Sequence, residues 1–167
     1  MRMDLIQPFI GSLDTVLAEM MNAPAKIVDL TMEEDGYRKK GAAALVCFRG
    51  QIEGRVILDM EPQAAAQVAS VLSEGEVDPA APLVFEAVCE LANMVIGNSV
   101  TLLNDQGFRF KVFPPEIHMN AEGLSGDHDT EAMVIAIETP CGLAYLNISM
   151  HYLHRRRHDR DIANVMD

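Results

Sequence analysis

The chain has 167 residues, 49% of them hydrophobic, which is enough for one domain with a substantial core. Its formal net charge of -12 argues against a nucleic-acid-binding surface, because phosphate contacts need clustered lysine and arginine. There is no apolar run near the roughly 20 residues of a membrane span and no signal-peptide pattern, so we expect a cytoplasmic protein with no membrane partner.

The first half of the chain is predicted to contain two helices separated by three strands. Apolar residues spaced by three and four positions indicate the helices, and alternating apolar residues indicate strands. Ala23-Pro24 ends the first helix, since proline disfavours a helical residue before it. The expected elements are a helix at 4–22, a strand at 26–33, a strand at 41–49 with apolar residues on both faces, a hairpin strand ending at Met60 and a short helix at 62–73.

The second half begins with a long helix at 83–104 and continues with strands. A strand from Phe108 is interrupted by Pro114-Pro115, because proline cannot donate a hydrogen bond to a sheet. Residues 121–130 are predicted to be a polar loop. Two further strands are expected at 131–138 and 143–152, joined by a tight turn at 139–142, and residues 154–167 form a polar tail.

The two halves match in their order of elements, which indicates an internal duplication covering about 4–75 and 82–153. We therefore predict an α+β fold: a pseudo-symmetric two-layer α/β domain at 1–153, with long helices packed on a largely antiparallel sheet of about six strands. The tail at 154–167 is predicted to lie outside this domain.

The cysteines are three in number and widely spaced, and each lies among apolar residues. This pattern predicts buried, reduced thiols without a catalytic role for Cys47, Cys89 and Cys141. We predict no metal site either. His151, His154 and His158 could share a helix face, but in a basic tail without nearby carboxylate pairs they are interpreted as solvated residues.

The polar residues of the 83–104 helix form one narrow stripe opposite its apolar side. They follow one another at steps of four, three, four, four and three, and they are Glu86, Glu90, Asn93, Gly97, Thr101 and Asn104. Glu90 and Asn93 are therefore neighbours on one face. Gly97 costs about 1 kcal/mol of helix propensity relative to alanine, and it leaves bare backbone beside the Asn93 amide.

This stripe resembles the signature helix of the CheC/CheX chemotaxis phosphatases. The matching segment is EAVCELANMVIGN at 86–98, in which an acidic or small residue is followed by E-x2-N and a small residue. The family more often has Asp or Ser where this chain has Glu86. Four further segments look like the CheX branch, so the resemblance covers nearly the whole chain: 7–10, 54–60, 108–113 and 139–142.

The resemblance implies a phosphatase, and thus a hydrolase, that acts on a CheY-like response regulator phosphorylated on aspartate. Asn93 would then orient the attacking water, and Glu90 would pair with the active-site lysine of the receiver domain. Glu86 and Gly97 would extend the partner-binding surface. The chain would need no cofactor of its own, because the receiver supplies the Mg²⁺. A hundredfold acceleration requires only about 2.7 kcal/mol, which one positioned amide can provide.

Alternatives remain open at this stage. Glu19 and Asn22 repeat the E-x2-N spacing, but Ala23-Pro24 stops that helix, so we interpret the pair as a degenerate second site. A non-catalytic module that binds a phosphorylated receiver, like the flagellar switch proteins, is the main rival function, and a structural subunit is another. A homodimer through a sheet edge is also open, with the strand from Phe108 or the one from Leu143 as the candidate edge.

Overall fold

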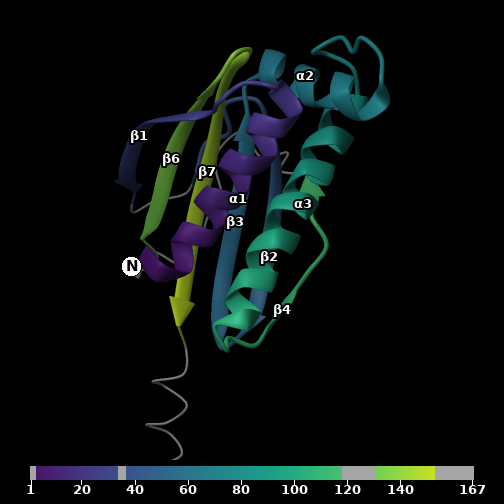
Figure 1. The fold of residues 1–167 in the computed structure, drawn as a ribbon. Coiled ribbons are helices and arrows are strands. Elements are labelled where there is room, and N and C mark those ends of the chain that lie inside the picture. Colours follow the sequence, from purple (N-terminus) through teal and green to yellow (C-terminus); the bar gives the residue numbers. More distant parts are fainter. Residues whose placement is uncertain (1–2, 34–36, 118–130, 153–167) are drawn as a thin grey trace, which may run out of the picture.

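The computed structural model describes residues 3–33, 37–117 and 131–152, and these residues form two layers. Three helices cover one face of a seven-stranded sheet in this part of the chain (Figure 1). The elements are α1 (Met3–Met21), β1 (Lys26–Glu33), β2 (Ala42–Gly50), β3 (Ile52–Met60), α2 (Pro62–Ser73), α3 (Leu83–Asp105), β4 (Phe110–Val112), β5 (Glu116–Ile117), β6 (Ala132–Thr139) and β7 (Gly142–Tyr152). The predicted fold class is confirmed.

The order of strands in the sheet displays the pseudo-twofold symmetry. The order is β1-β6-β7-β3-β2-β4, β5 also pairs with β2, and every pairing is antiparallel. The central strands β7 and β3 come from different halves of the chain, and the two halves run outwards from them in matching order. Each half also gives an outer strand to the other half, since β1 pairs with β6 and β4 pairs with β2.

The main core lies between the sheet and the helices. It contains the apolar side chains of α1, α2 and α3 together with the helix-facing residues of β2, β3, β6 and β7. Two buried hydroxyl groups fix α1 against α3 within it. Ser12 Oγ donates to the carbonyl oxygen of Val95 at 3.1 Å, and Ser99 Oγ lies 2.7 Å from the same oxygen and 3.2 Å from that of Pro8.

A smaller apolar cluster on the opposite face of the sheet contains Tyr37 and Ile57. Beside it, the fully buried carboxylate of Asp59 accepts hydrogen bonds from the Tyr37 hydroxyl at 2.7 Å and from the backbone N–H groups of Lys40 and Gly41. Burial and the adjacent Asp59 carboxylate raise the pKa of Tyr37 above its usual range, so this hydroxyl stays protonated and keeps donating. Asp59 therefore fixes the segment 37–41 against the end of the sheet.

Three expectations from the sequence need correction. Cys47 is exposed and not buried, and Cys89 and Cys141 are only partly buried. The strand at 41–49 is covered on both faces only in its first part, because the small cluster on the opposite face ends before Cys47. The strand from Leu143 is no edge, since β7 pairs with both β3 and β6. The polar loop predicted at 121–130 and the tail at 154–167 lie outside the described residues.

The long helix α3, with 23 residues, is long and apolar enough to cross a membrane by length and composition alone, although the sequence predicted no such span. Its apolar side is buried against the sheet, with Val84, Val88, Leu91 and Val95 each at most 2% exposed. Its other side carries the polar stripe. A buried apolar side and an exposed polar side are typical of an amphipathic helix that packs on the core of a domain.

Candidate functional site

The outer face of α3 carries the residues that the sequence singled out. The side chains of Glu86, Glu90 and Asn93 are all exposed, and so is Gly97. Because three- and four-residue steps bring side chains onto one helix face, Glu90 and Asn93 lie one turn apart and project in the same direction. In the part of the chain that the structure describes, no hydrogen bond engages the side chains of Glu86, Glu90 or Asn93. Their polar ends are free to meet another molecule.

The helix that presents this face is held firmly from behind. Its buried stripe packs on the sheet, and the hydroxyl groups of Ser12 and Ser99 bridge it to α1. The Val95 carbonyl that both hydroxyls approach is two residues beyond Asn93. The backbone under the polar stripe is therefore fixed by contacts that do not use the stripe itself, which is what a pre-organised site needs.

Gly97 has no steric reason, within the described chain, to be glycine. A Cβ atom added there meets no other atom within 4 Å, and the carbonyl oxygen of Gly97 accepts a hydrogen bond from Thr101 Oγ1 at 3.0 Å, as a regular helix allows. The open space beside Gly97 faces outwards, next to Asn93. A glycine at this position exposes backbone that an approaching surface could contact closely.

The second E-x2-N pair is arranged differently. Glu19 is exposed near the end of α1, but the helix ends at Met21 and Asn22 has a φ of 50°. Asn22 thus adopts the left-handed conformation that ends helices, and the N–H of Ala23 closes the last turn on the carbonyl of Ala18. The two side chains do not share a helix face as Glu90 and Asn93 do.

A cation that the sequence did not indicate lies near the N-terminal end of the polar stripe. Phe85 directly precedes Glu86 on α3, and the Lys39 ammonium lies 6.0 Å from the centre of its ring. Phe85 and Cys89 form the partly buried flank of the stripe. Burial, followed by the charge of Glu86, raises the pKa of the Cys89 thiol, which keeps it protonated and poorly nucleophilic. Nothing in the spacing along the sequence brings residues 39 and 85 together.

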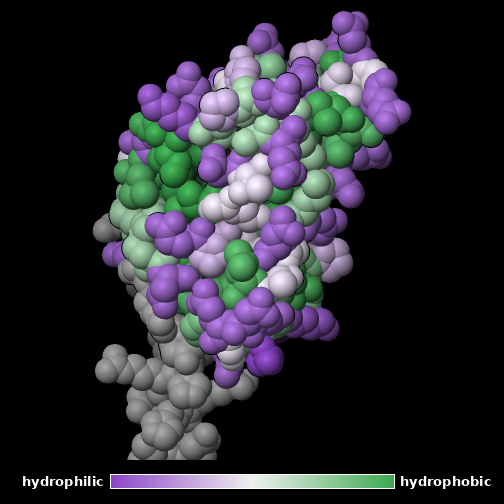
Figure 2. Space-filling model, in the orientation of Figure 1, coloured by the Kyte–Doolittle hydropathy of each residue, from purple (hydrophilic) through white to green (hydrophobic). Residues whose placement is uncertain are grey.

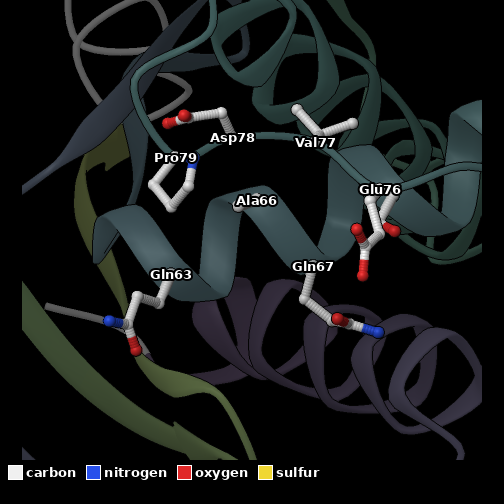
Figure 3. A pocket seen from close by; sticks show the side chains of 8 residues that line it. Gln63, Ala66, Gln67, Glu76, Val77, Asp78 and Pro79 are labelled. Atoms are coloured by element: carbon white, nitrogen blue, oxygen red, sulfur yellow. The ribbon is translucent and has the colours of Figure 1, made fainter.

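The polar stripe is an exposed helix face. A hollow of about 540 Å³ lies elsewhere, between α2 and the connector at 76–79, lined by Gln63, Gln67 and Asp78 among others (Figure 3). Among the described residues, no group of three or more His, Cys, Asp or Glu side chains is placed to hold a metal ion. His151 is exposed near the end of β7, while His154 and His158 lie outside the described ranges.

The chemistry available on this face is limited to two functions. A carboxylate such as Glu90 can pair with a cation of a partner, and an amide such as Asn93 can both accept and donate hydrogen bonds without titrating. An exposed helix face with these groups suits insertion into a cleft of another protein. It does not enclose a small molecule.

Comparison with known proteins gives a consistent result. Residues 42–138 match the family model of the chemotaxis phosphatase CheX, which is more than half of the chain. No curated protein matches the sequence.

Three solved structures illustrate the structural similarity. A CheC-like superfamily protein from Shewanella sp. PV-4 is 25% identical, with a TM-score of 0.78 over 90% of this chain and 99% of that one. CheX from Borrelia burgdorferi, in a complex with CheY, BeF3 and Mg²⁺, is 28% identical, with a TM-score of 0.69 over 90% and 99%. FliY from Thermotoga maritima, at 17% identity, shares the fold, with a TM-score of 0.62 over 84% of each chain.

Proposed function

Because the chain belongs to the CheX family of chemotaxis phosphatases, we propose that it accelerates the dephosphorylation of a response regulator phosphorylated on aspartate. The partner is a CheY-like receiver domain. The observation that carries the proposal is the pair Glu90 and Asn93, exposed one turn apart on a helix that the core holds rigid. A cytoplasmic location follows from this proposal, since such receivers are cytoplasmic.

Asn93 is proposed to orient the attacking water. Hydrolysis of an acyl phosphate depends mainly on positioning and electrostatic stabilisation, so the helper needs no strong base. The Asn93 carbonyl oxygen can accept a hydrogen bond from a water in line with the phosphorus, while its NH₂ group fixes the side chain against the partner. A hundredfold acceleration corresponds to about 2.7 kcal/mol, within the range that orientation alone supplies.

Glu90 is proposed to dock the partner by pairing with a lysine in the receiver's active site, and Glu86 and Gly97 to extend the contact. Such a charge-assisted hydrogen bond would set the position of Asn93 one turn away. The chain has no cofactor in this scheme, because Mg²⁺ is bound by the receiver. CheX of Borrelia burgdorferi forms a complex with CheY that contains Mg²⁺ and BeF3, which supports a partner of this kind.

A second candidate function is a binding module that holds a phosphorylated receiver without hydrolysing it. The fold alone does not decide between this alternative and the enzyme, because one scaffold can carry different functions. The presence of both Glu90 and Asn93 on one exposed face favours the enzyme.

A homodimer is part of the proposal as well, and the strand predicted from Phe108 is at an edge of the sheet, as β4. The edges of the described sheet are β1 on one side and β4 with β5 on the other. β1 exposes an apolar group to solvent, formed by Ile27, Val28, Leu30 and Met32, each between 44% and 48% exposed. Hydrophobic residues, coloured green in Figure 2, form a patch on the β1 and β6 side of the molecule. The particle mass in solution tests for such a dimer.

The decisive experiment measures phosphate release from the phosphorylated CheY-like receiver of the same cell, in the presence of Mg²⁺. We expect wild type to accelerate release, Asn93→Ala to remove the acceleration while still binding, and Glu90→Ala to weaken binding. The thermal unfolding temperature of each variant controls for folding. Binding without acceleration by wild type would favour the binding module, and the absence of both would refute the two candidate functions together.

A further inference from the structure

We propose that Lys39 is a docking residue for the phosphorylated partner, placed beside the polar stripe to attract the negatively charged phosphoryl group and its acidic surroundings. This inference rests on the proposed function, because it names a further contact of the same site. It goes beyond the E-x2-N motif, since Lys39 lies in a different segment and on no part of that helix.

The placement of Lys39 is the first support. Its side chain is half-buried, with Nζ 6.0 Å from the centre of the Phe85 ring, at the distance of a cation–π contact. Phe85 is adjacent to Glu86 in the first turn of α3, and Glu90 comes one turn later. The Lys39 charge therefore lies near the N-terminal end of the helix that carries the stripe.

The rigidity of its segment is the second support. The Asp59 carboxylate accepts hydrogen bonds from the Tyr37 hydroxyl and from the backbone of Lys40 and Gly41, on either side of Lys39 in the chain. A lysine on a free loop loses side-chain and backbone entropy when it binds, but most of that loss has already occurred here.

The stability of α3 does not explain a cation at this position. The N-terminal turn of a helix carries partial positive charge, so a nearby lysine is mildly unfavourable for the helix. The hydrogen bonds and ion pairs of the described residues provide no carboxylate partner for Lys39, and its contact there is the Phe85 ring. The Phe85 ring does not neutralise the Lys39 charge, so this charge remains available to a partner.

The negative charge of the whole molecule makes a local positive charge useful for binding an anionic partner. With a net charge of -12, the chain repels an anionic partner at a distance, and Glu86 and Glu90 add to that repulsion at the site. A phosphoryl group on aspartate adds further negative charge to the partner. Lys39 supplies a local positive charge on the flank of the stripe, which favours the phosphorylated form over the unphosphorylated form.

The adjacent residue provides a matched control. The Lys40 ammonium lies 5.1 Å from the Tyr145 ring and 5.7 Å from the Tyr37 ring, on the face of the sheet opposite the helices. Lys39→Gln and Lys40→Gln therefore change the net charge equally, one residue apart, on opposite sides of the molecule. Only the first changes the charge beside Phe85.

The test measures the affinity of the full chain for the CheY-like receiver of the same cell, loaded with Mg²⁺ and BeF3, and also the rate of phosphate release. For Lys39→Gln we expect affinity to fall roughly three- to tenfold at low salt, with the difference shrinking at high salt and the saturated rate unchanged. Lys39→Glu should weaken binding further, and Lys39→Arg should restore it. Lys40→Gln should stay within about twofold of wild type.

The outcomes separate this proposal from the function on which it rests. If wild type binds, Glu90→Ala weakens binding and Lys39→Gln matches wild type, the role of Lys39 is overturned and the proposed function stands. Equal losses for Lys39→Gln and Lys40→Gln would also overturn it, because they would show an effect of net charge alone. If wild type neither binds the receiver nor accelerates phosphate release, both proposals fail.

Discussion

The chain contains the E-x2-N spacing twice, and the two copies differ in the backbone after the asparagine. In α3 the helix continues for about three turns beyond Asn93, to Asp105, and both side chains stay on one exposed face. In α1 the helix stops at Met21, so Asn22 takes a left-handed conformation with φ of 50°. The same spacing gives a shared face in one place and a helix end in the other.

The difference shows that the residues of a motif can act together only when the backbone fixes the relative direction of their side chains. Glu90 and Asn93 are held by a helix that the core and the buried hydroxyls of Ser12 and Ser99 anchor from behind. For Asn22, the side chain is free of that constraint, and an asparagine at a helix end has an ordinary structural use. This contrast between the two copies can be tested directly.

The largest expected effect comes from removing each amide in turn. Asn93→Ala should lower the stimulated rate of phosphate release about a hundredfold, the equivalent of about 2.7 kcal/mol. Asn22→Ala should leave the rate unchanged and lower the free energy of unfolding by about 1 kcal/mol, because alanine is disfavoured at positive φ. The rate assay and chemical denaturation measure the two quantities. A loss of activity in Asn22→Ala with the fold intact would show that the second copy also functions.

A smaller effect is expected at the two open helical glycines. A Cβ atom added at Gly97, or at Gly11 in α1, would have no atom of another described segment within 4 Å. Alanine at either position should therefore stabilise its helix by about 1 kcal/mol. Only Gly97 lies beside the proposed site. Gly97→Ala should weaken receiver binding severalfold, because the added methyl group obstructs close approach, and Gly11→Ala should not. Equal binding by both variants would remove Gly97 from the partner-binding surface.

The smallest expected effect is the change in stability when Asn22 or Asn93 is replaced by glycine. Asn22→Gly should leave stability unchanged or slightly raised, since glycine adopts positive φ without strain, whereas Asn93→Gly should lose about 0.3–0.5 kcal/mol of helix propensity. The same substitution therefore lowers the free energy of unfolding at position 93 and does not lower it at position 22. Thermal unfolding followed by circular dichroism should show a difference of roughly 1 °C between the two. A loss at position 22 equal to that at 93 would contradict the left-handed conformation of Asn22.

Local patterns in the sequence predicted the helices and most strands correctly. The apolar spacing of α3 and the stop at Ala23-Pro24 depend on near neighbours along the chain, so they could be interpreted without the fold. The exposure of Glu86, Glu90, Asn93 and Gly97 followed from the same periodicity. The roles proposed for these residues came from the family resemblance and stay predictions.

Features that depend on distant pairings could not be predicted in this way. The strand from Leu143 looked like a candidate edge, but its position between β3 and β6 is set by partners far away in the sequence. Cys47 looked buried because its neighbours are apolar, although the opposite face of the sheet is uncovered at that point. The approach of Lys39 to Phe85 is likewise a result of tertiary packing.

The exchange of outer strands between the halves also has a consequence for how the chain is made. Lys26 in β1 pairs with Glu138 in β6, so β1 has no partner strand in this sheet until more than a hundred further residues have been made. The first half alone would present one unpaired edge on each of β2 and β3, because their other neighbours, β4 and β7, come later in the chain. Such long-range pairings make folding slow and leave sheet edges open in the meantime. The nascent first half should therefore be the stage at which a chaperone matters most, and fragments cut between the halves should aggregate before they fold.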